Sequence, residues 1–533
     1  MHYTLLYILG LLFAVFLLVM LAKRIRVAYP ILLVVAGLAI SFVPGIPNSS
    51  LDPELIFLIF LPPLLYEAAW YTSWNDFWKW KRPIALLAFG LVFFTSIIIA
   101  CCSSIFIPGF TLALGFLVGG IVSPPDAVAA ATVMKNMKIP KRFMTVLEGE
   151  SLVNDASSLI VFKFALAAIL TGHFSMQEAL GQFFVVAIMG IVIGLIGANI
   201  LYVIHKFLPT TPAIDAALSV MTPYLLFLFA EQFHFSGIMA VVSGGLFMSW
   251  KSHEIFNTGS TRLNMLGVWN TLIFVMNALV FILIGLELPQ IIENLGNYSI
   301  FDAIKYGLII SVITIVVRYL WVFPSAHVPR WLSSKIRKNE ASPGWKGPLV
   351  ISYAGMRGVV SLATALSIPL LLPNGSLFPE RNLIIFITFI VIFITLVFQG
   401  LTLPLIIKLI NIKEIDPIQP SEEQQANIQL LLEKNALKII AEKHHLKSVE
   451  NDLLGIYKCN LENNVENLQR KIASLDCDEM EFKKIKEYNT ILQQVYALQR
   501  KELFRFRKEK LFSDEEIRKA EMQLDLNDLK ISD

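Results

Sequence analysis

Charge is scarce in this sequence, since only 16% of its 533 residues are Asp, Glu, Lys or Arg. A soluble protein is typically about 25% charged, and 56% of the residues here are hydrophobic, so the composition excludes a single soluble enzyme domain and a mostly disordered chain. Cysteine is also rare, and the four cysteines form no C-x-x-C motif, which excludes a disulfide scaffold and gives no indication of a cysteine metal site. The composition therefore indicates an integral membrane protein.

The charges that are present divide the chain into two parts. Residues 1–412 carry 24 Lys/Arg and 17 Asp/Glu, whereas the 121 residues from 413 to 533 carry 20 Lys/Arg and 24 Asp/Glu. We therefore predict a transmembrane domain over residues 1–410 and a water-facing tail over residues 411–533. The net charge of +3 gives no indication of nucleic-acid binding, because most Lys and Arg of the first part lie in short loops between apolar runs.

Long apolar runs indicate how the first part crosses the membrane. A hydrocarbon core about 30 Å thick requires around 20 apolar residues per helix, which predicts an all-α membrane protein. Thirteen candidate runs lie near residues 3–22, 28–43, 53–72, 83–105, 111–132, 143–170, 180–204, 215–233, 236–250, 264–288, 303–323, 348–372 and 382–407. Lys and Arg concentrate in every second loop, so the positive-inside rule places the N-terminus outside. Because thirteen is odd, the tail is predicted to be cytoplasmic.

Two of these runs contain residues that interrupt a helix. The fifth contains Ser123-Pro124-Pro125-Asp126, where two prolines remove amide donors, and the twelfth contains Gly355-Met356-Arg357-Gly358, where glycines permit unwinding. Each is the fifth run of a six-run half, so we predict two inverted repeats whose discontinuous helices cross at the midplane. Asp126 would then offset the positive ends of the half-helices and Arg357 the negative ends. The alternatives are an ordinary proline kink and an arginine that reaches the membrane surface.

The sixth run carries the densest polar group, from Glu148 to Asp155, with the sequence EGESLVND. Ser151 and Asp155 lie one helical turn apart on one face. A hard cation such as Na⁺ prefers oxygen ligands, which Asp155, Ser151, the carbonyl groups near Pro125 and a water molecule could supply. Because a buried carboxyl group is neutralised by a proton or by a cation but not by both, we predict that the two ions compete for Asp155.

Glu150 and Asn154 occupy the adjacent face of the same run, again one turn apart. An acid beside Arg318 is expected to stay ionised, so we predict an ion pair between Glu150 and Arg318 that orients Asn154. For Glu150 a purely structural role is an equal alternative to binding the cation. For the whole group the alternative is a polar patch that packs helices together.

These motifs, taken in order, resemble a known family. The strings are Leu61-Pro62-Pro63-Leu64-Leu65-Tyr66-Glu67, Ser123-Pro124-Pro125-Asp126, Gly149-Glu150-Ser151-Leu152-Val153-Asn154-Asp155, Ser236-Gly237-Ile238 and Gly355-Met356-Arg357-Gly358. Together they resemble the sodium/proton exchanger family of cation:proton antiporters, in a bacterial form, over about residues 1–410. The resemblance implies a homodimeric exchanger of thirteen helices in the bacterial inner membrane, which needs no cofactor and moves a core domain in the manner of an elevator.

The resemblance also implies roles for individual residues. Asp155 matches the essential acid that carries cation and proton, and the residues that match positions near the bound ion are Asp126, Glu150 and Ser151. Arg318 and Arg357 match arginines that pair with the sixth helix or balance the crossing. Asn154 before the acid is associated with electroneutral exchange of one Na⁺ (or Li⁺, with K⁺ as a further candidate) for one H⁺. Pro125 replaces the threonine sometimes found there, so the ion preference stays open.

Four further charged residues fall inside the predicted runs. Glu67 is predicted to face a cytoplasmic funnel or to lie on its rim. Glu231 and Glu287 are near the outer ends of their runs and are predicted to be solvated. Lys163 lies eight residues beyond Asp155 and could extend its amino group outward along the helix.

The tail has helical periodicity and a single glycine, Gly455, in residues 421–533. A nucleotide-binding unit with a glycine-rich turn is therefore unsupported, and helical hairpins or a dimerising bundle are favoured, with an unknown partner. A passive channel and a transport-dead sensor are the alternatives to exchange. An enzyme is not indicated, because the loops present no nucleophile–base pair.

Overall fold

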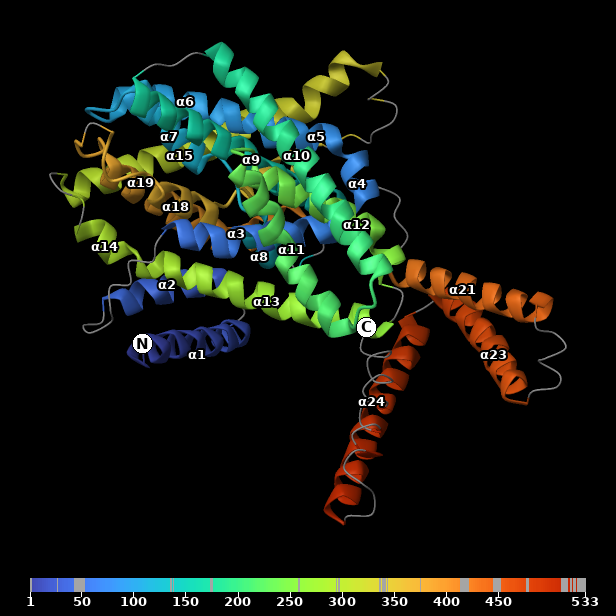
Figure 1. Cartoon of the computed structure of the whole chain (residues 1–533). Coiled ribbons are helices and arrows are strands. Elements are labelled where there is room, and N and C mark those ends of the chain that lie inside the picture. Colours follow the sequence, from blue (N-terminus) through green and yellow to red (C-terminus); the bar gives the residue numbers. More distant parts are fainter. Residues whose placement is uncertain are drawn as a thin grey trace. The chain divides into compact units, whose positions relative to one another are not determined.

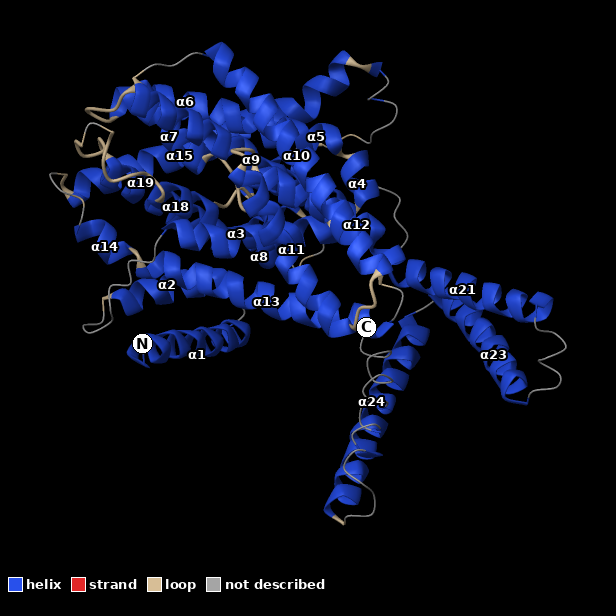
Figure 2. Cartoon of the chain, viewed as in Figure 1, coloured by secondary structure: helices blue, strands red, loops and turns tan. Residues whose placement is uncertain are grey.

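The computed structural model describes residues 2–25, 27–42, 53–134, 137, 139–172, 176–256, 259–293, 295, 298–334, 337, 342, 344–373, 375–412, 421–443, 452–475, 479–509 and four positions between 516 and 524. In these residues the regular structure is helical, apart from one antiparallel bridge between Leu371 and Leu377 (Figure 2). The predicted all-α fold class is thus confirmed. The chain forms two compact units, Met1–Asp416 and Pro417–Asp533.

The first unit begins with helices that cover the first seven predicted runs. They are α1 (His2–Ile25), α2 (Tyr29–Ser41), α3 (Pro53–Tyr71), α4 (Trp74–Lys79), α5 (Lys81–Ala85), the π-helical η1 (Leu86–Leu91), α6 (Val92–Phe106), α7 (Leu112–Val122), α8 (Ala127–Met134), α9 (Lys141–Thr171) and α10 (Met176–Phe207). The elements α5, η1 and α6 form one continuous helical stretch, whereas the short α4 separates it from α3 (Figure 1).

The remaining helices of this unit cover the last six predicted runs. They are α11 (Pro212–Gln232), α12 (Gly237–Ile255), α13 (Gly259–Leu286), α14 (Leu288–Glu293), α15 (Ile300–Leu332), α17 (Lys346–Tyr353), α18 (Val359–Leu366), α19 (Arg381–Phe393), the π-helical η2 (Ile394–Gln399) and α20 (Gly400–Ile410). A π-helical turn inside an α-helix is uncommon and often marks a functional region. Here η2 carries Thr395, which faces one of the two helix breaks.

Eight of the described helical stretches are long and apolar enough to cross a membrane. They are Lys81–Phe106, Leu112–Met134, Lys141–Thr171, Gly181–Phe207, Pro212–Gln232, Gly259–Glu293, Ile300–Leu332 and Arg381–Ile410. The large apolar side chains of Phe184, Ile188 and Ile196 on α10 are exposed, as expected of a surface that contacts lipid rather than water. The chain is therefore a multi-pass membrane protein.

Both predicted helix interruptions are present. The first half-helix α7 ends at Val122 and α8 begins at Ala127, while α17 ends at Tyr353 and α18 begins at Val359. The two interrupted helices pack together through α7 and α18, and α9 packs along α7. Gly119 lets α6 and α7 approach closely, because a Cβ there would lie 2.7 Å from the Cα atom of Ser96. This packing places both breaks beside the polar face of α9.

The second unit consists of helices in the residues that the structure describes. They are α21 (Ser421–Lys443), α23 (Asp452–Leu475) and α24 (Glu479–Lys508), and α21 packs along α23 as a helical hairpin. Their surface ion pairs follow the three- or four-residue spacing of a helix, as in Arg470 with Glu466 at 2.5 Å, and such exposed pairs contribute little stability. The regulatory or dimerising role of this unit stays a prediction.

Candidate ion-binding site

The two helix breaks contact each other directly and satisfy each other's backbone. The amide of Asp126 donates a hydrogen bond to the Met356 carbonyl at 2.6 Å. In the opposite direction, Arg357 Nε donates to the Val122 carbonyl at 3.0 Å, and Arg357 Nη1 donates to the Gly355 carbonyl. A helix end inside a membrane leaves amide and carbonyl groups that no water can satisfy. The crossing of the two breaks supplies those missing partners.

Asp126 caps the half-helix that follows the first break. Its Oδ1 accepts hydrogen bonds from the Val128 amide at 2.8 Å and from the Ala129 amide at 3.5 Å. A carboxylate in this position satisfies free amides and interacts favourably with the positive end of the helix. The side chain also lies against Gly358, because a Cβ added at that glycine would overlap Asp126 Oδ2. Asp126 thus sits at the N-terminal ends of both α8 and α18.

The absence of a side chain at Gly358 leads to a testable prediction. Gly358→Ala is expected to displace the Asp126 carboxylate and to lower the stability by about 1–3 kcal/mol, the usual cost of overpacking. Gly181→Ala is the matched control, because a Cβ there meets no atom within 4 Å and alanine favours a helix over glycine. Thermal unfolding in detergent measures both, and equal melting temperatures for the Gly358 variant and wild type would contradict the close contact.

Two residues of α9 tie this helix to the first break. Ser151 Oγ accepts a hydrogen bond from the Ala127 amide at 3.2 Å, and Asn154 Nδ2 donates to the Pro125 carbonyl at 3.0 Å. The face of α9 that the sequence marked as polar therefore supports the break on the neighbouring helix. A carbonyl oxygen has two lone pairs, so the Pro125 oxygen can still accept a second contact.

Asp155 lies on the same helix, and its carboxylate has no hydrogen-bond donor among the described residues. Its side chain is buried, with 7% of the residue exposed, and its carboxylate accepts no hydrogen bond and forms no ion pair among the described residues. The exposed part faces a cavity of about 480 Å³ that Pro125, Asp126 and Ser151 also line. Since a buried acid is costly without a partner, this carboxyl group is suited to holding an ion from the cavity.

The cavity opens toward solvent on one side. Among its lining residues Tyr71 and Glu148 are exposed, whereas Asp155 lies at the buried end. Glu67 also lines the cavity and is half-buried, in agreement with a position in a funnel or on its rim. Together with Asp126, four acidic side chains therefore line the cavity.

Glu150 points away from the cavity into a fully buried ion pair. Its Oε1 and Oε2 lie 2.6 Å and 2.8 Å from Arg318 Nη1 and Nη2, and neither residue is more than 1% exposed. Arg318 Nε additionally donates to the Ile351 carbonyl at 3.2 Å. This two-point contact connects α9, α15 and α17. Neither Glu150 nor Asn154 lines the cavity in the part of the chain that the structure describes.

Arg357 is enclosed by the protein, with 1% of the residue exposed. Its guanidinium group donates to two carbonyls of the crossing, and its amide donates to Thr395 Oγ1 of η2 at 3.1 Å. The guanidinium group thus lies at the carbonyl ends of half-helices, where a positive charge is favourable. The alternative of a surface-reaching arginine is wrong for this residue.

Several polar residues of the site are absent from the sequence interpretation. Thr395 holds the second break, and the others line the cavity, namely Tyr29, Thr132, Asn277 and Ser361. Each is a single polar residue in an apolar run, and that pattern gives no information about which neighbouring helix it faces. The buried Asn277 on α13 carries the clearest signal, since an amide is seldom placed in an apolar helix without a polar partner or cavity.

The charged residues outside the site, Lys163, Glu231 and Glu287, agree only in part with the prediction that they are solvated. Lys163 Nζ lies 3.3 Å from Glu231 Oε2, and both side chains are partly exposed, as expected for solvated ends. The prediction that Glu287 is solvated is wrong, because the residue is only 9% exposed. Glu287 falls between the end of α13 and the start of α14, which continue as one helical stretch from Gly259 to Glu293. This stretch stays within the protein there, because α14 packs against α19 and α2.

Comparisons with known proteins agree with this architecture. Residues 11–409 match the family described as sodium/hydrogen exchanger, transmembrane. The sodium, potassium, lithium and rubidium/H⁺ antiporters of Bacillus pumilus and Bacillus subtilis are 34% and 36% identical over 81% and 71% of this chain, which spans 65% and 57% of their lengths. The sodium proton antiporter MjNhaP1 of Methanocaldococcus jannaschii superimposes with a TM-score of 0.59 at 20% identity, over 74% of this chain and 99% of that protein. The chain therefore belongs to the transmembrane sodium/hydrogen exchanger family.

Proposed function

We propose that this chain is a secondary active transporter that exchanges Na⁺ for H⁺ across the bacterial inner membrane. The family is one of cation/proton antiporters and not of enzymes. The names of the two Bacillus relatives include potassium, lithium and rubidium beside sodium, so Li⁺ and K⁺ are further candidate substrates. The observation that carries the proposal is the buried Asp155 carboxylate. It faces a cavity that Asp126, Ser151 and Pro125 also line, and no described residue donates a hydrogen bond to it.

The proposed mechanism is competition between the two ions at Asp155. In the cation-bound state, the ligands are the Asp155 and Asp126 carboxylates, the Ser151 hydroxyl and the Pro125 carbonyl, all of which line one cavity. In the other state, Asp155 carries a proton and the cation leaves, because a buried carboxylate without a counter-charge is costly. Glu150, Asn154, Arg318 and Arg357 then have a positioning role, since they hold α9 and the two breaks in place.

The proposed topology has thirteen membrane crossings arranged as two inverted repeats of six. The halves meet at the interrupted helices, in the arrangement that secondary transporters use for a site at the midplane. The N-terminus is outside and the tail is cytoplasmic. The exposed cavity residues Tyr71 and Glu148 lie at the ends of α3 and α9 that the loop charges assign to the cytoplasm, so this conformation is inward-open. Alternating access by a moving core domain, within a homodimer, completes the cycle.

Reconstituted vesicles test this function directly. The purified chain is inserted into liposomes with an acidic interior that contain a fluorescent pH indicator, and Na⁺, Li⁺ or K⁺ is added outside. We expect proton efflux that depends on the added cation and saturates. Cation conductance without proton movement would show a passive channel, and no flux of either ion would support a transport-dead sensor.

Asn154 in front of Asp155 leads to a prediction about stoichiometry. One-for-one exchange moves no net charge, so the initial rate is expected to stay the same when a membrane potential is imposed with a gradient of the permeant anion thiocyanate, in the absence of K⁺. A single transported charge would gain ~2.3 kcal/mol per 100 mV, which is large enough to detect. A clear acceleration or slowing by the potential would reject one-for-one exchange. The Na⁺ dependence must be measured first without a potential, as the reference.

A further inference from the structure

A small cavity lies between four helices of the first unit, and it shares no described lining residue with the ion cavity. Its volume is about 50 Å³, and its walls come from the starts of α5, α9 and α17 and from the C-terminal third of α15. Two half-buried arginines line it, Arg82 of α5 and Arg142 of α9. The rest of the described lining is apolar, except for Ser325 of α15.

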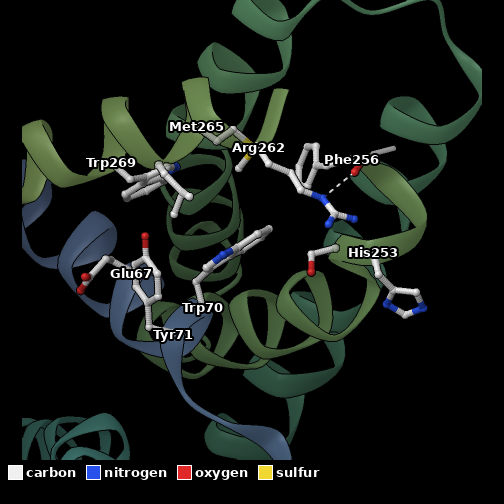
Figure 3. Close-up of a pocket in the computed structure, with 10 residues that line it drawn as sticks. Glu67, Trp70, Tyr71, His253, Phe256, Arg262, Met265 and Trp269 are labelled. Atoms are coloured by element: carbon white, nitrogen blue, oxygen red, sulfur yellow. Dashed lines mark hydrogen bonds between the residues drawn. The ribbon is translucent and has the colours of Figure 1, made fainter. Parts of the chain in front are cut away.

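The described lining of this cavity contains no acid. Two guanidinium groups that share one small volume repel each other, and the repulsion is strong where little water screens it. Neighbouring cavities are different in this respect. The ion cavity has four acids in its wall, and Figure 3 shows a recess in which Glu67 of α3 accompanies Arg262 of α13. The lining of the small cavity therefore favours an anion.

Two helix starts add positive potential at the same place. Arg142 and Phe143 belong to the first turn of α9, and Gly347 and Pro348 belong to the first turn of α17. Neither helix has an acidic residue in its first turn or a side-chain cap, so their positive ends keep their partial charge. Gly347 lets the two turns meet, because a Cβ there would lie 2.7 Å from Phe143 Cζ. Phosphate groups are common ligands of such helix starts.

Aromatic residues orient Arg142 and indicate the depth of the cavity. The Arg142 guanidinium lies over the buried Trp80 ring, 4.2 Å from its centroid. A stacked guanidinium directs its N–H groups within its own plane, in the geometry that holds two oxygens of a phosphate. On α4, which contacts α5 and α9, the exposed Trp74 and Trp78 stack at 5.6 Å. Tryptophan is enriched at the membrane–water interface, which places the cavity near the level of the lipid phosphates.

We propose that this cavity binds a negatively charged phosphate group, with Arg82 and Arg142 as its counter-charges. The cavity has the size of a single tetrahedral oxyanion, so the remainder of a larger ligand stays outside. The phosphate comes from a phospholipid headgroup or from a soluble phosphate, since both present the same oxygen atoms. The bound group connects the starts of α9 and α17 with α5. Its binding does not rest on the proposed exchange function, and the Asp155→Asn protein is expected to bind it as wild type does.

Calorimetric titration of the purified full-length chain in a non-ionic detergent tests the binding. The probes are inorganic phosphate and dioctanoyl phosphatidate, and binding of at least one is expected. Arg142→Gln is expected to weaken that binding by about tenfold or more, because charge-assisted hydrogen bonds are lost. Arg24→Gln is the matched control, the same change at the exposed end of α1, and is expected to bind as wild type does. Failure of both probes to bind, or equal affinity of wild type and Arg142→Gln, would overturn the proposal.

Two variants of Ser325 separate charge from shape, and they keep the test decisive if Arg142→Gln does not fold. Ser325→Asp places a carboxylate in the wall of the cavity and is expected to abolish the binding. Ser325→Asn adds a side chain of the same size without the charge and is expected to retain most of the affinity. Equal affinities of the Asp and Asn variants would show that the charge in the cavity is unimportant, which contradicts the proposal.

The two probes also identify the source of the phosphate. Binding of phosphatidate alone indicates a lipid headgroup, and binding of inorganic phosphate alone indicates a soluble phosphate. Competition between the two indicates that the group is recognised whatever carries it, and each of these three results supports the proposal. Dioctanoyl phosphatidylcholine has the same acyl chains and a headgroup without net charge, and is expected not to bind. If it bound as tightly as phosphatidate, the acyl chains and not the charged phosphate would be the ligand, and the proposal would be wrong.

Discussion

Asp155→Asn is expected to abolish cation/proton exchange in reconstituted vesicles. The amide cannot release a proton at any relevant pH, so proton coupling is lost completely. The cation loses its buried counter-charge as well, and its affinity is expected to fall by about 100-fold or more, because an amide dipole replaces a full negative charge in a site with little water. Sodium-dependent proton efflux measures the first effect, and sodium titration of the purified protein measures the second.

The same substitution is expected to leave the protein folded. No described residue donates a hydrogen bond to the Asp155 carboxylate, so an isosteric amide breaks no internal contact. Glu231→Gln serves as the control for transport, since it makes the same chemical change at a partly exposed acid paired with Lys163. Normal exchange by a folded Asp155→Asn protein, or sodium binding whose affinity is indifferent to pH in wild type, would contradict competition at this carboxyl group.

The crossing of the two breaks explains why one acid can be left without a partner. Asp126 and Arg357 neutralise the ends of the half-helices, and Glu150 and Arg318 neutralise each other. Asn154 Nδ2 and Ser151 Oγ form hydrogen bonds with backbone groups of the first break. These charges and hydrogen-bonding groups of the crossing and of α9 are thus used for structure. In the proposed mechanism, the transported ion is the partner of the Asp155 carboxylate.

Much of the fold follows from the sequence, because apolar runs and helix breakers act locally. The paired prolines at 124 and 125 and the glycines at 355 and 358 place the interruptions where the structure has them. The ends of the helices are harder to predict from the sequence. For example, α15 continues to Leu332, nine residues beyond the predicted run. A run of apolar residues shows where hydrocarbon ends, whereas a helix can continue into the polar interface.

Some residues of the site can likewise be predicted from the local sequence, whereas others depend on contacts between distant segments. The turn-spaced polar residues of α9 could be recognised, because helical periodicity places them on shared faces. The contacts of Thr395 with Arg357 and of Asn154 with Pro125 depend on how distant segments pack, which no local pattern contains. The burial of Glu287 was missed for the same reason, because it depends on the packing of α14 against the distant α19 and α2.

Arg318→Ala is expected to destabilise the protein severely, by about 3–5 kcal/mol. The substitution leaves the Glu150 carboxylate without a counter-charge at a fully buried position and removes the hydrogen bond from Arg318 Nε to the Ile351 carbonyl. Three helices, α9, α15 and α17, then lose their common contact. The thermal midpoint of the detergent-solubilised protein measures the effect, and an exchange assay on the surviving folded fraction shows whether the position of α9 is altered.

The double variant Glu150→Gln/Arg318→Met separates the buried charge from the lost contact. If the main cost of Arg318→Ala is an unpaired carboxylate, removing both charges is expected to restore a large part of the stability, because a buried ion pair replaced by groups of similar volume is often nearly neutral. The exposed pair of Lys163 and Glu231 provides the matched comparison, and Lys163→Ala is expected to cost no more than about 1 kcal/mol. Unchanged melting of Arg318→Ala, or a double variant less stable than the single one, would contradict the assignment of Glu150 and Arg318 as the pair that positions α9.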